Sequence, residues 1–293
     1  MSTSSAADAT STSVVVGSNG APGSVERCLE ALASQVEGVE VIVCEPAASS
    51  AAVQARFPNV RFLERRDALV PELWRDGIDA STGDVVCLTI SPMRPREDWV
   101  ARARHLAATA GGVGGALEPG EGLRLRDWAE YFCRYGRDML PFEERQTPDL
   151  PGDNAAYTRA ALAKVRAVYR DGFWEPDVNR ALVEQGERLV HSPELVVHMG
   201  RSSGFRAFVR QRLVHGRAYG RQRGRRFSRG RNAAGVALAV VVPALLLVRT
   251  FRQVFSRRRL RMCLVLSVPA LVAYDVAWAA GEAAGHLDSL RGR

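Results

Sequence analysis

Alternation of short apolar strands with helical segments constrains the fold of this chain more than any other feature. Four apolar runs begin at Val14, Val39, Asn59 and Asp84, and segments with helical spacing of apolar residues separate them. Strands that are apolar throughout belong to parallel sheets whose two faces are both covered by helices. The sequence therefore predicts an α/β, Rossmann-like fold with a mostly parallel sheet and helices on both faces.

The strict alternation ends after residue 119. Residues 111–119 predict one more strand and residues 125–136 a helix. Residues 141–152 are rich in Pro and Gly and indicate a loop, and residues 154–165 predict a further helix. Beyond residue 172 we expect a loop, a helix and a pair of strands.

Two apolar stretches close the chain. Residues 233–248 are sixteen residues without a charge, and residues 262–280 are longer but contain Pro269 and Asp275. Sixteen helical residues span about 24 Å, which is short of a bilayer core of about 30 Å. If both stretches crossed a membrane, the six arginines of residues 249–261 would be translocated, against the positive-inside tendency. We favour a shallow re-entrant or in-plane helical hairpin, and a two-span hairpin is the alternative.

These features divide the chain into three parts. Residues 1–13 predict a disordered, polar tail without the basic and apolar regions of a signal peptide. Residues 14–223 predict a single α/β domain, and residues 224–293 a basic segment followed by the membrane-associated helical hairpin.

Charge and cysteine content narrow the partners and the compartment. The formal net charge is +8, and seven arginines lie within residues 217–231 alone. Such clustering favours the anionic lipid of a membrane surface as a partner. Nucleic acid is not expected, because the arginine run lacks interleaved aromatic residues and a recognisable motif. The five scattered cysteines predict reduced, mostly buried thiols of a cytosolic protein.

An ordered set of segments between Val14 and Arg223 resembles glycosyltransferase family 2. The segments are "PELWRDGIDASTGD", "GDVVCLTISPMRPREDW", "PGDNAAYTRAAL", "GFWEPDVNRALVEQGERL" and "RQRLVHGRAYGRQRG". The closing "AWAAGEAAGHL" is similar to membrane-associated members. The resemblance implies a GT-A fold and an inverting, hexosyltransferase-type transfer of a sugar from a nucleotide-diphosphate sugar. It also implies a lipid-linked or cell-envelope glycan acceptor at the cytoplasmic face of the cell membrane.

The resemblance assigns the donor to the carboxyl ends of the first strands and to the helix that precedes the fourth. A carboxylate at a strand end is suited to a nucleoside, and an arginine fork is suited to a diphosphate. As single residues, a glutamate in a loop and an arginine on a helix are equally typical of solvated surfaces. The implied donor-binding residues are Gly17, Ser18, Asn19, Glu45, Arg75, Asp76 and Ser91.

The Asp-x-Asp motif that binds Mg²⁺ or Mn²⁺ in this family is missing. Its position falls on Ile90, Ser91 and Pro92, and these side chains do not suit a hard cation. A Mg or Mn cofactor is therefore possible, but its ligands are not found. Either basic residues neutralise the diphosphate, which we favour, or catalysis has been lost and the chain is an inert module that binds a nucleotide sugar or a glycan.

The resemblance places the catalytic base on Glu175, and Asp177 is the alternative. An inverting transfer needs one carboxylate to take the proton of the acceptor hydroxyl. Acids at these positions also suit a helix N-terminus, and Asp153 or Asn154 also suits a helix cap. The implied acceptor- and diphosphate-binding residues are Asp153, Asn154, Trp174, Arg210 and Arg212, with Gln211, His215 and Arg217 as further candidates.

Overall fold

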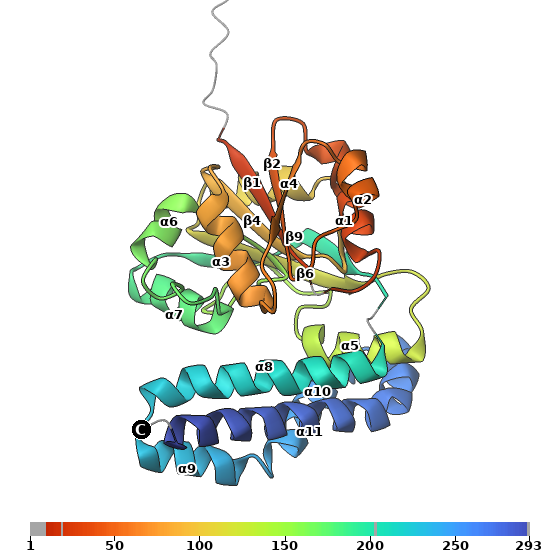
Figure 1. The fold of residues 1–293 in the computed structure, drawn as a ribbon. Coiled ribbons are helices and arrows are strands. Elements are labelled where there is room, and N and C mark those ends of the chain that lie inside the picture. Colours follow the sequence, from red (N-terminus) through yellow and green to blue (C-terminus); the bar gives the residue numbers. More distant parts are fainter. Residues whose placement is uncertain (1–9, 19, 202–203, 292–293) are drawn as a thin grey trace, which may run out of the picture. The chain divides into compact units, whose positions relative to one another are not determined.

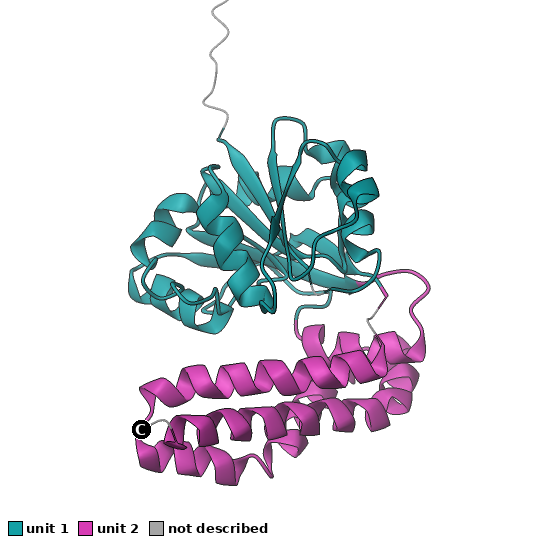
Figure 2. Ribbon diagram, in the orientation of Figure 1, with its two compact units in different colours: residues 1–118, 138–200 teal, residues 119–137, 201–293 magenta. Residues whose placement is uncertain are grey.

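The chain forms two compact units in the computed structural model, which describes residues 10–18, 20–201 and 204–291. Residues 1–118 and 138–200 make one unit, which we call the sheet unit (Figure 2). Residues 119–137 and 201–293 make the other, which we call the helical unit. The predicted division at residues 13 and 223 stays a prediction.

A nine-stranded sheet, ordered β3-β2-β1-β4-β8-β6-β9-β5 with β7 paired to β9, forms the sheet unit. Strand β1 is parallel to both β2 and β4, and β2 is parallel to β3, as the apolar runs predict. Strand β8 is antiparallel to β4 and to β6, and β9 is antiparallel to β5 and to β7. The sheet as a whole is therefore mixed, with the expected parallel order from β3 to β4. The strands are β1 Thr12–Gly17, β2 Glu40–Glu45, β3 Val60–Glu64, β4 Val85–Ile90, β5 Met93–Pro95, β6 Gly112–Pro119, β7 Arg145–Gln146, β8 Asn154–Thr158 and β9 Leu189–Met199.

Helices cover both faces of this sheet, which confirms the predicted fold class. Helices α1 and α2 lie on one face and α3 on the other (Figure 1), as right-handed crossovers require when the strand order reverses after β3. Trp74 and Leu73 of α3 are fully buried against the sheet. The helices of the sheet unit are α1 Ser24–Leu32, the 3₁₀ turn η1 Ala33–Gln35, α2 Ala51–Arg56, α3 Val70–Ala80, α4 Trp99–Ala107, α6 Arg159–Lys164 and α7 Glu175–Glu184.

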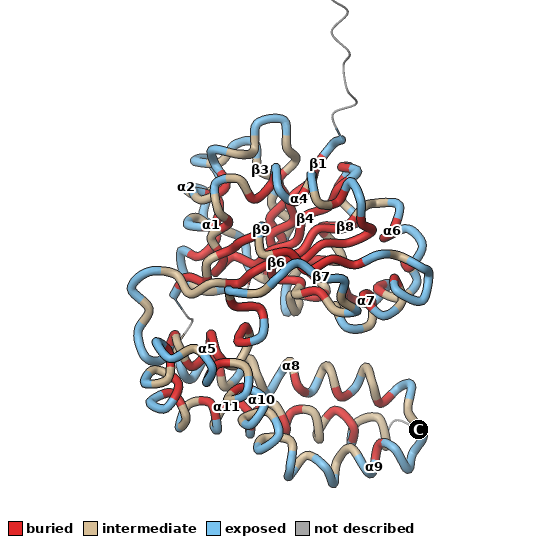
Figure 3. The backbone as a smooth tube through the Cα atoms, turned by 180° about the vertical axis from the view of Figure 1, so that it is seen from behind, coloured by how far each residue is buried: buried red, intermediate tan, exposed pale blue. Residues whose placement is uncertain are grey.

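The strands form the most deeply buried part of the sheet unit (Figure 3). Val14, Val15 and Val16 of β1 have no exposed surface, which explains why this run carries no polar residue facing solvent. Burial also raises the pKa of the Cys28 and Cys87 thiols to about 12. All five cysteines are free, and the predicted thiols of the sheet unit are confirmed as buried.

Two expectations for local structure were wrong. Residues 154–165 form strand β8 and the short helix α6 instead of one helix, because Ala155, Ala156 and Tyr157 are inserted in the sheet beside β4. Thr158 then caps α6 by accepting a hydrogen bond from the Ala161 amide. The expected strand pair near the end of the sheet unit is one continuous strand, β9.

The helical unit contains two long helices, α8 and α11, that lie side by side (Figure 1). Glycines line their contact. A Cβ atom on Gly216 would lie 2.5 Å from the Trp278 carbonyl oxygen, and one on Gly220 would lie 2.3 Å from that of Glu282. Close backbone approach through small residues four apart is the packing mode of G-xxx-G helix pairs. The helices are α5 Leu125–Tyr135, α8 Phe205–Arg226, α9 Arg229–Leu238, α10 Val242–Val254, the 3₁₀ turn η2 Arg258–Leu260 and α11 Arg261–Arg291.

The C-terminal apolar stretches are helical, but the first is not one straight helix. Helices α9 and α10 meet at a bend of 66°. Pro243 lies in the first turn of α10, where its missing N–H costs no helix hydrogen bond. Among the described residues, Arg258–Arg291 is the one unbroken helix long and apolar enough to cross a membrane, and α9 with α10 would be a second only as a bent span.

Candidate functional site

The carboxyl ends of β1, β2 and β4 are joined by hydrogen bonds, and this brings three predicted donor segments together. The Ser18 amide donates to the Cys44 carbonyl at 2.8 Å, and the Ser91 amide donates to the Gly17 carbonyl at 3.0 Å. The Ser24 hydroxyl, in the first turn of α1, donates to the Ser91 hydroxyl at 2.8 Å. Hydroxyl groups and a helix N-terminus at a strand edge are suited to phosphate oxygens.

The Trp74 side chain packs beside the ends of β1 and β4. Its indole N–H donates to the Thr89 carbonyl at 2.9 Å, so the ring is held across the end of β4. A Cβ atom on Gly17 would lie 3.1 Å from the indole nitrogen of Trp74. The glycine at the end of β1 therefore provides space beside the indole ring, and a side chain there would require the ring to shift by a few tenths of an ångström.

Glu175 lies at the same edge of the sheet. A Cβ atom on Gly152 would lie 2.7 Å from Oε1 of Glu175 and 2.9 Å from Cη2 of Trp74, so Gly152 lies between these two side chains. The neighbouring Asp153 carbonyl accepts a hydrogen bond from the Thr89 hydroxyl at 3.0 Å. The predicted base and the start of the predicted acceptor loop are thus brought to the end of β4.

Trp174 is the residue before α7, and its extended backbone starts that helix. A Cβ atom on Gly172 would lie 3.2 Å from the indole nitrogen of Trp174. Asp177, the alternative base, forms an ion pair with Arg180 one turn further along α7 and is mostly buried. The Asp177 carboxylate is therefore engaged along its own helix, whereas that of Glu175 lies beside Gly152 and Trp74.

The end of β4 does not fit a divalent metal ion. Ile90 and Ser91 are almost fully buried, and neither Ile90 nor Pro92 offers a side-chain oxygen. Within the described ranges, no group of three or more His, Cys, Asp or Glu side chains is arranged to hold a metal ion. The described residues thus provide no metal ligands at the position of the missing motif.

Arg75 and Asp76 are paired with each other. Nε of Arg75 lies 2.6 Å from Oδ1 of Asp76, and an Nη atom of Arg75 donates to the Arg170 carbonyl at 2.8 Å. Asp76 also accepts from Arg65 at 3.0 Å. These bonds tie α3 to the strand and loop beside it, so neither side chain is directed by its contacts toward the serines at the end of β4.

Glu45 and Asn154 are buried and hydrogen-bonded. The Glu45 carboxylate accepts from the Ser49 amide at 2.6 Å and from the Ser49 hydroxyl at 2.7 Å, which closes the turn after β2. The Asn154 amide donates to the Ala116 and Leu195 carbonyls and accepts from the Trp99 indole at 2.7 Å. Asn154 therefore links β8 to neighbouring strands and to α4. Asn19 lies outside the described residues.

The predicted basic acceptor residues all belong to α8 of the helical unit. Arg210 is exposed, and the Arg212 guanidinium lies 4.3 Å from the Trp278 ring centroid. Arg217 binds Asp288 through two hydrogen bonds at 2.7 and 2.9 Å. Burial, with the nearby Arg134 and Arg212 charges, lowers the pKa of His215 to about 4. Arg212 and Arg217 thus make contacts within their own unit.

Two residues near the end of β4 were missed by the sequence analysis. Arg94 of β5 is in register with His198 of β9, and both are half-buried. Arg94 lies three positions after Ser91, so their Cα atoms are at most about 10 Å apart along an extended chain. Among the described residues, no carboxylate forms an ion pair with Arg94. The available signal was a basic residue two positions after the missing acidic motif.

Comparison with known proteins supports the fold. No protein-family model and no curated protein sequence matches the chain. Its structure is similar to that of a mannosyltransferase, PcManGT from Pyrobaculum calidifontis, in complex with GDP-Man and Mn²⁺. The TM-score is 0.52 at 18% identity, over 92% of this chain and 86% of that one. It is also similar to GalNAc-T7 with UDP, GalNAc and Mn²⁺, with a TM-score of 0.50 at 13% identity, over 70% of this chain and 48% of that one. The chain thus has a GT-A-like fold shared with glycosyltransferases.

Proposed function

We propose that this protein is an inverting glycosyltransferase of family 2 that moves a hexose from a nucleotide-diphosphate sugar to a lipid-linked or cell-envelope glycan. The observation that carries the proposal is the gathering of Gly17, Ser91 and Glu175 around Trp74 at the carboxyl edge of a GT-A-like sheet. Ligands of open α/β sheets bind beyond this edge. Both similar structures contain a nucleotide or a nucleotide sugar.

In this reaction the acceptor oxygen attacks C1 of the sugar as the bond from C1 to the diphosphate breaks. The nucleoside diphosphate leaves from the opposite face, which inverts the configuration at C1. Glu175 takes the proton of the attacking hydroxyl, because its carboxylate lies beside Gly152 and Trp74 at the carboxyl edge of the sheet. The buried hydroxyls of Ser24 and Ser91, hydrogen-bonded to each other, hold the first turn of α1 beside the end of β4 on the donor side.

Arg94 is our candidate for offsetting the negative charge of the diphosphate without a metal ion. Arg94 belongs to β5, the strand that follows Ser91, and is half-buried. Among the described residues, no acidic side chain forms an ion pair with it. An arginine fork pairs with two phosphate oxygens at once. Arg75 is less suited, because Asp76 already offsets its charge.

The helical unit is proposed to hold the enzyme on the cytoplasmic face of the cell membrane. Leu245 of α10 is 64% exposed and Val240, at the bend before it, is 84% exposed. Exposed apolar side chains beside clustered arginines are typical of helices that lie in a membrane interface. In flotation with anionic vesicles, Leu245→Asp should weaken binding, whereas Val183→Asp, on exposed α7 of the sheet unit, should not. Equal loss in both variants would contradict this placement.

A screen of nucleotide sugars by thermal shift tests the donor part of the proposal. A ligand that binds only the native state raises the unfolding temperature as its concentration increases. The same donors, incubated with membrane extract, should yield a glycosylated product. If no nucleotide sugar shifts the unfolding temperature, the proposed donor site is wrong.

A sugar- or nucleotide-binding module without catalysis is the second candidate function. The presence of Ile90 and Pro92 in place of metal-binding acids favours it. Donor binding without any transfer to membrane extract, in the presence or absence of Mn²⁺, would establish this second candidate.

A further inference from the structure

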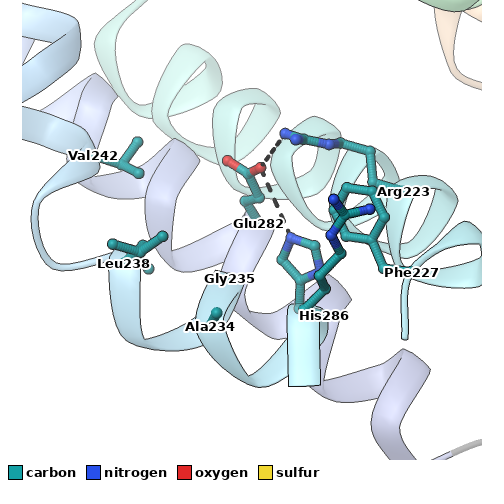
Figure 4. A pocket seen from close by; sticks show the side chains of 10 residues that line it. Arg223, Phe227, Ala234, Gly235, Leu238, Val242, Glu282 and His286 are labelled. Carbon is teal, nitrogen blue, oxygen red and sulfur yellow. Dashed lines mark hydrogen bonds and ion pairs between the residues drawn. The ribbon is translucent and has the colours of Figure 1, made fainter. Parts of the chain in front are cut away.

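A cavity of about 520 Å³ lies within the helical unit, between α8, α9, α10 and α11. Its walls differ in character (Figure 4). Leu238 and Val242 lie at one end, whereas Arg223, Phe227 and His286 lie at the other. The volume is within the range of small-molecule sites, which is roughly 300–1,000 Å³. A ligand that fits both ends must combine an apolar part with a polar head.

The polar end carries a positive charge that is not offset locally. Arg223 donates to Glu282 at 3.1 Å, and Nε2 of His286 lies 3.9 Å from the same carboxylate, so the charge of Glu282 is already balanced. Arg231 also lines the cavity, and its guanidinium lies 5.6 Å from the Phe227 ring centroid. In the described part of the chain, no carboxylate pairs with Arg231. The unbalanced charge therefore favours an anionic head, and phosphate oxygens suit an arginine fork.

The apolar end leads onto exposed hydrophobic surface. Leu238, at the end of α9, is 58% exposed, and Val241 at the bend is 48% exposed. The 66° bend between α9 and α10 lies beside these residues, and Leu238, Ala239 and Val242 around it line the cavity. A chain of methylene groups that leaves the cavity here would lie along the same apolar surface that we place in the membrane.

We propose that this cavity binds one membrane phospholipid by its anionic phosphate head, with Arg231 as the phosphate ligand and an acyl chain directed along the bend between α9 and α10. The site is distinct from the carboxyl edge of the sheet. The inference rests on the membrane association proposed above and does not depend on sugar transfer.

Isothermal titration of the full-length protein with dihexanoyl phosphatidic acid, kept below its micelle concentration, tests the proposal. One lipid should bind per chain, and Arg231→Gln should weaken binding about tenfold, as expected for loss of one charge-assisted hydrogen bond. Arg229→Gln removes the same charge from an exposed residue of α9 outside the cavity and should leave affinity unchanged. Equal loss in the two variants would show general surface attraction and overturn the proposal.

A second pair of variants tests the cavity itself. Ala234→Trp fills it and should abolish lipid binding, whereas Ala233→Trp places the same ring on exposed α9 surface and should not. Dihexanoyl phosphatidylcholine should bind more weakly than phosphatidic acid. Inorganic phosphate that competes as well as the lipid would show a free-phosphate site instead, and absence of binding would end the proposal. Neither outcome depends on donor binding, which is measured separately.

Discussion

The two compact units have opposite charge. The sheet unit, residues 1–118 and 138–200, contains 26 acidic and 17 basic residues, whereas the helical unit contains six acidic residues and 23 arginines. An acidic unit must bind an anionic donor through a few well-placed groups, because its overall field repels the ligand. A basic unit attracts any anionic surface over its whole length. The positive net charge of the chain therefore comes from the helical unit alone, because the sheet unit has a negative net charge.

Replacing Glu175 should give the largest effect, and this effect should be confined to the activity of the sheet unit. Glu175→Gln preserves shape but removes the proton acceptor, so turnover should fall by about 10²–10⁴-fold. Donor affinity and vesicle binding should not change. Asp177→Asn should have a smaller effect, since Asp177 is engaged with Arg180. Steady-state transfer with calorimetric donor binding measures both, and a larger loss in Asp177→Asn would exchange the two roles.

Glycine substitutions at α8 and α9 should have effects of opposite sign. Gly220→Ala forces a methyl group against the Glu282 carbonyl oxygen, at 2.3 Å, and should destabilise the helical unit by about 1–3 kcal/mol. Gly230→Ala meets nothing within 4 Å and should stabilise α9 by about 0.5–1 kcal/mol. Hydrogen exchange by mass spectrometry should show faster exchange in α8 for the first variant only. Faster exchange in the strands as well would mean that the units do not unfold separately.

Arg94 tests how an acidic unit binds an anion. Arg94→Gln should weaken donor affinity about tenfold, through loss of one hydrogen bond to a charged group. Arg75→Gln is the matched control, because Asp76 already offsets Arg75. Donor binding to the unmodified protein should persist in EDTA. If EDTA abolishes binding while Arg94→Gln has no effect, a metal ion replaces Arg94 in this role.

The smallest expected difference between the two units is in the reactivity of their cysteines. The thiolate is the reactive form, and burial raises the pKa of Cys28, Cys44 and Cys87 in the sheet unit to about 12. At pH 8 these thiols should therefore resist iodoacetamide, whereas the half-exposed Cys263 should be alkylated first. Peptide mass spectrometry locates the label, and early labelling of Cys87 would show that β4 opens in the native state.

Strands with continuous apolar runs were predictable, because their burial in a parallel sheet leaves a pattern that one sequence displays. Strand β8, residues 154–158, was not predictable. Its Ala-Ala-Tyr sequence suits a helix equally well, and only the pairing with β4 makes it a strand. Gly17 and Ser91, which the family resemblance assigns to the donor, and Glu175, which it assigns as the base, lie near one edge of the sheet, and their roles stay predictions. The sequence analysis could not foresee that Arg75 would pair with the adjacent Asp76, because such pairing depends on side-chain directions.

The sequence of the helical unit also contains a regular spacing of glycines, but its arginine-rich segment was interpreted from its charge alone. Glycines at 216, 220 and 224, and again at 281 and 285, recur every four residues among the arginines and small residues. That spacing places them on one helix face. The arginine run was assigned to ligands, whereas the glycines between the arginines determine how closely α8 and α11 approach.

The same glycines set an order of events during synthesis of the chain. Each glycine inside a helix costs about 1 kcal/mol relative to alanine, so α8 is a weak helix on its own. Gly216 and Gly220 on its glycine-lined face pack against α11, whose Gly281 and Gly285 are made some sixty residues later. While a ribosome is still producing that distance of chain, α8 lacks its contact with α11. The contact between α8 and α11 can therefore form only after α11 has been made, when both halves of the glycine contact exist.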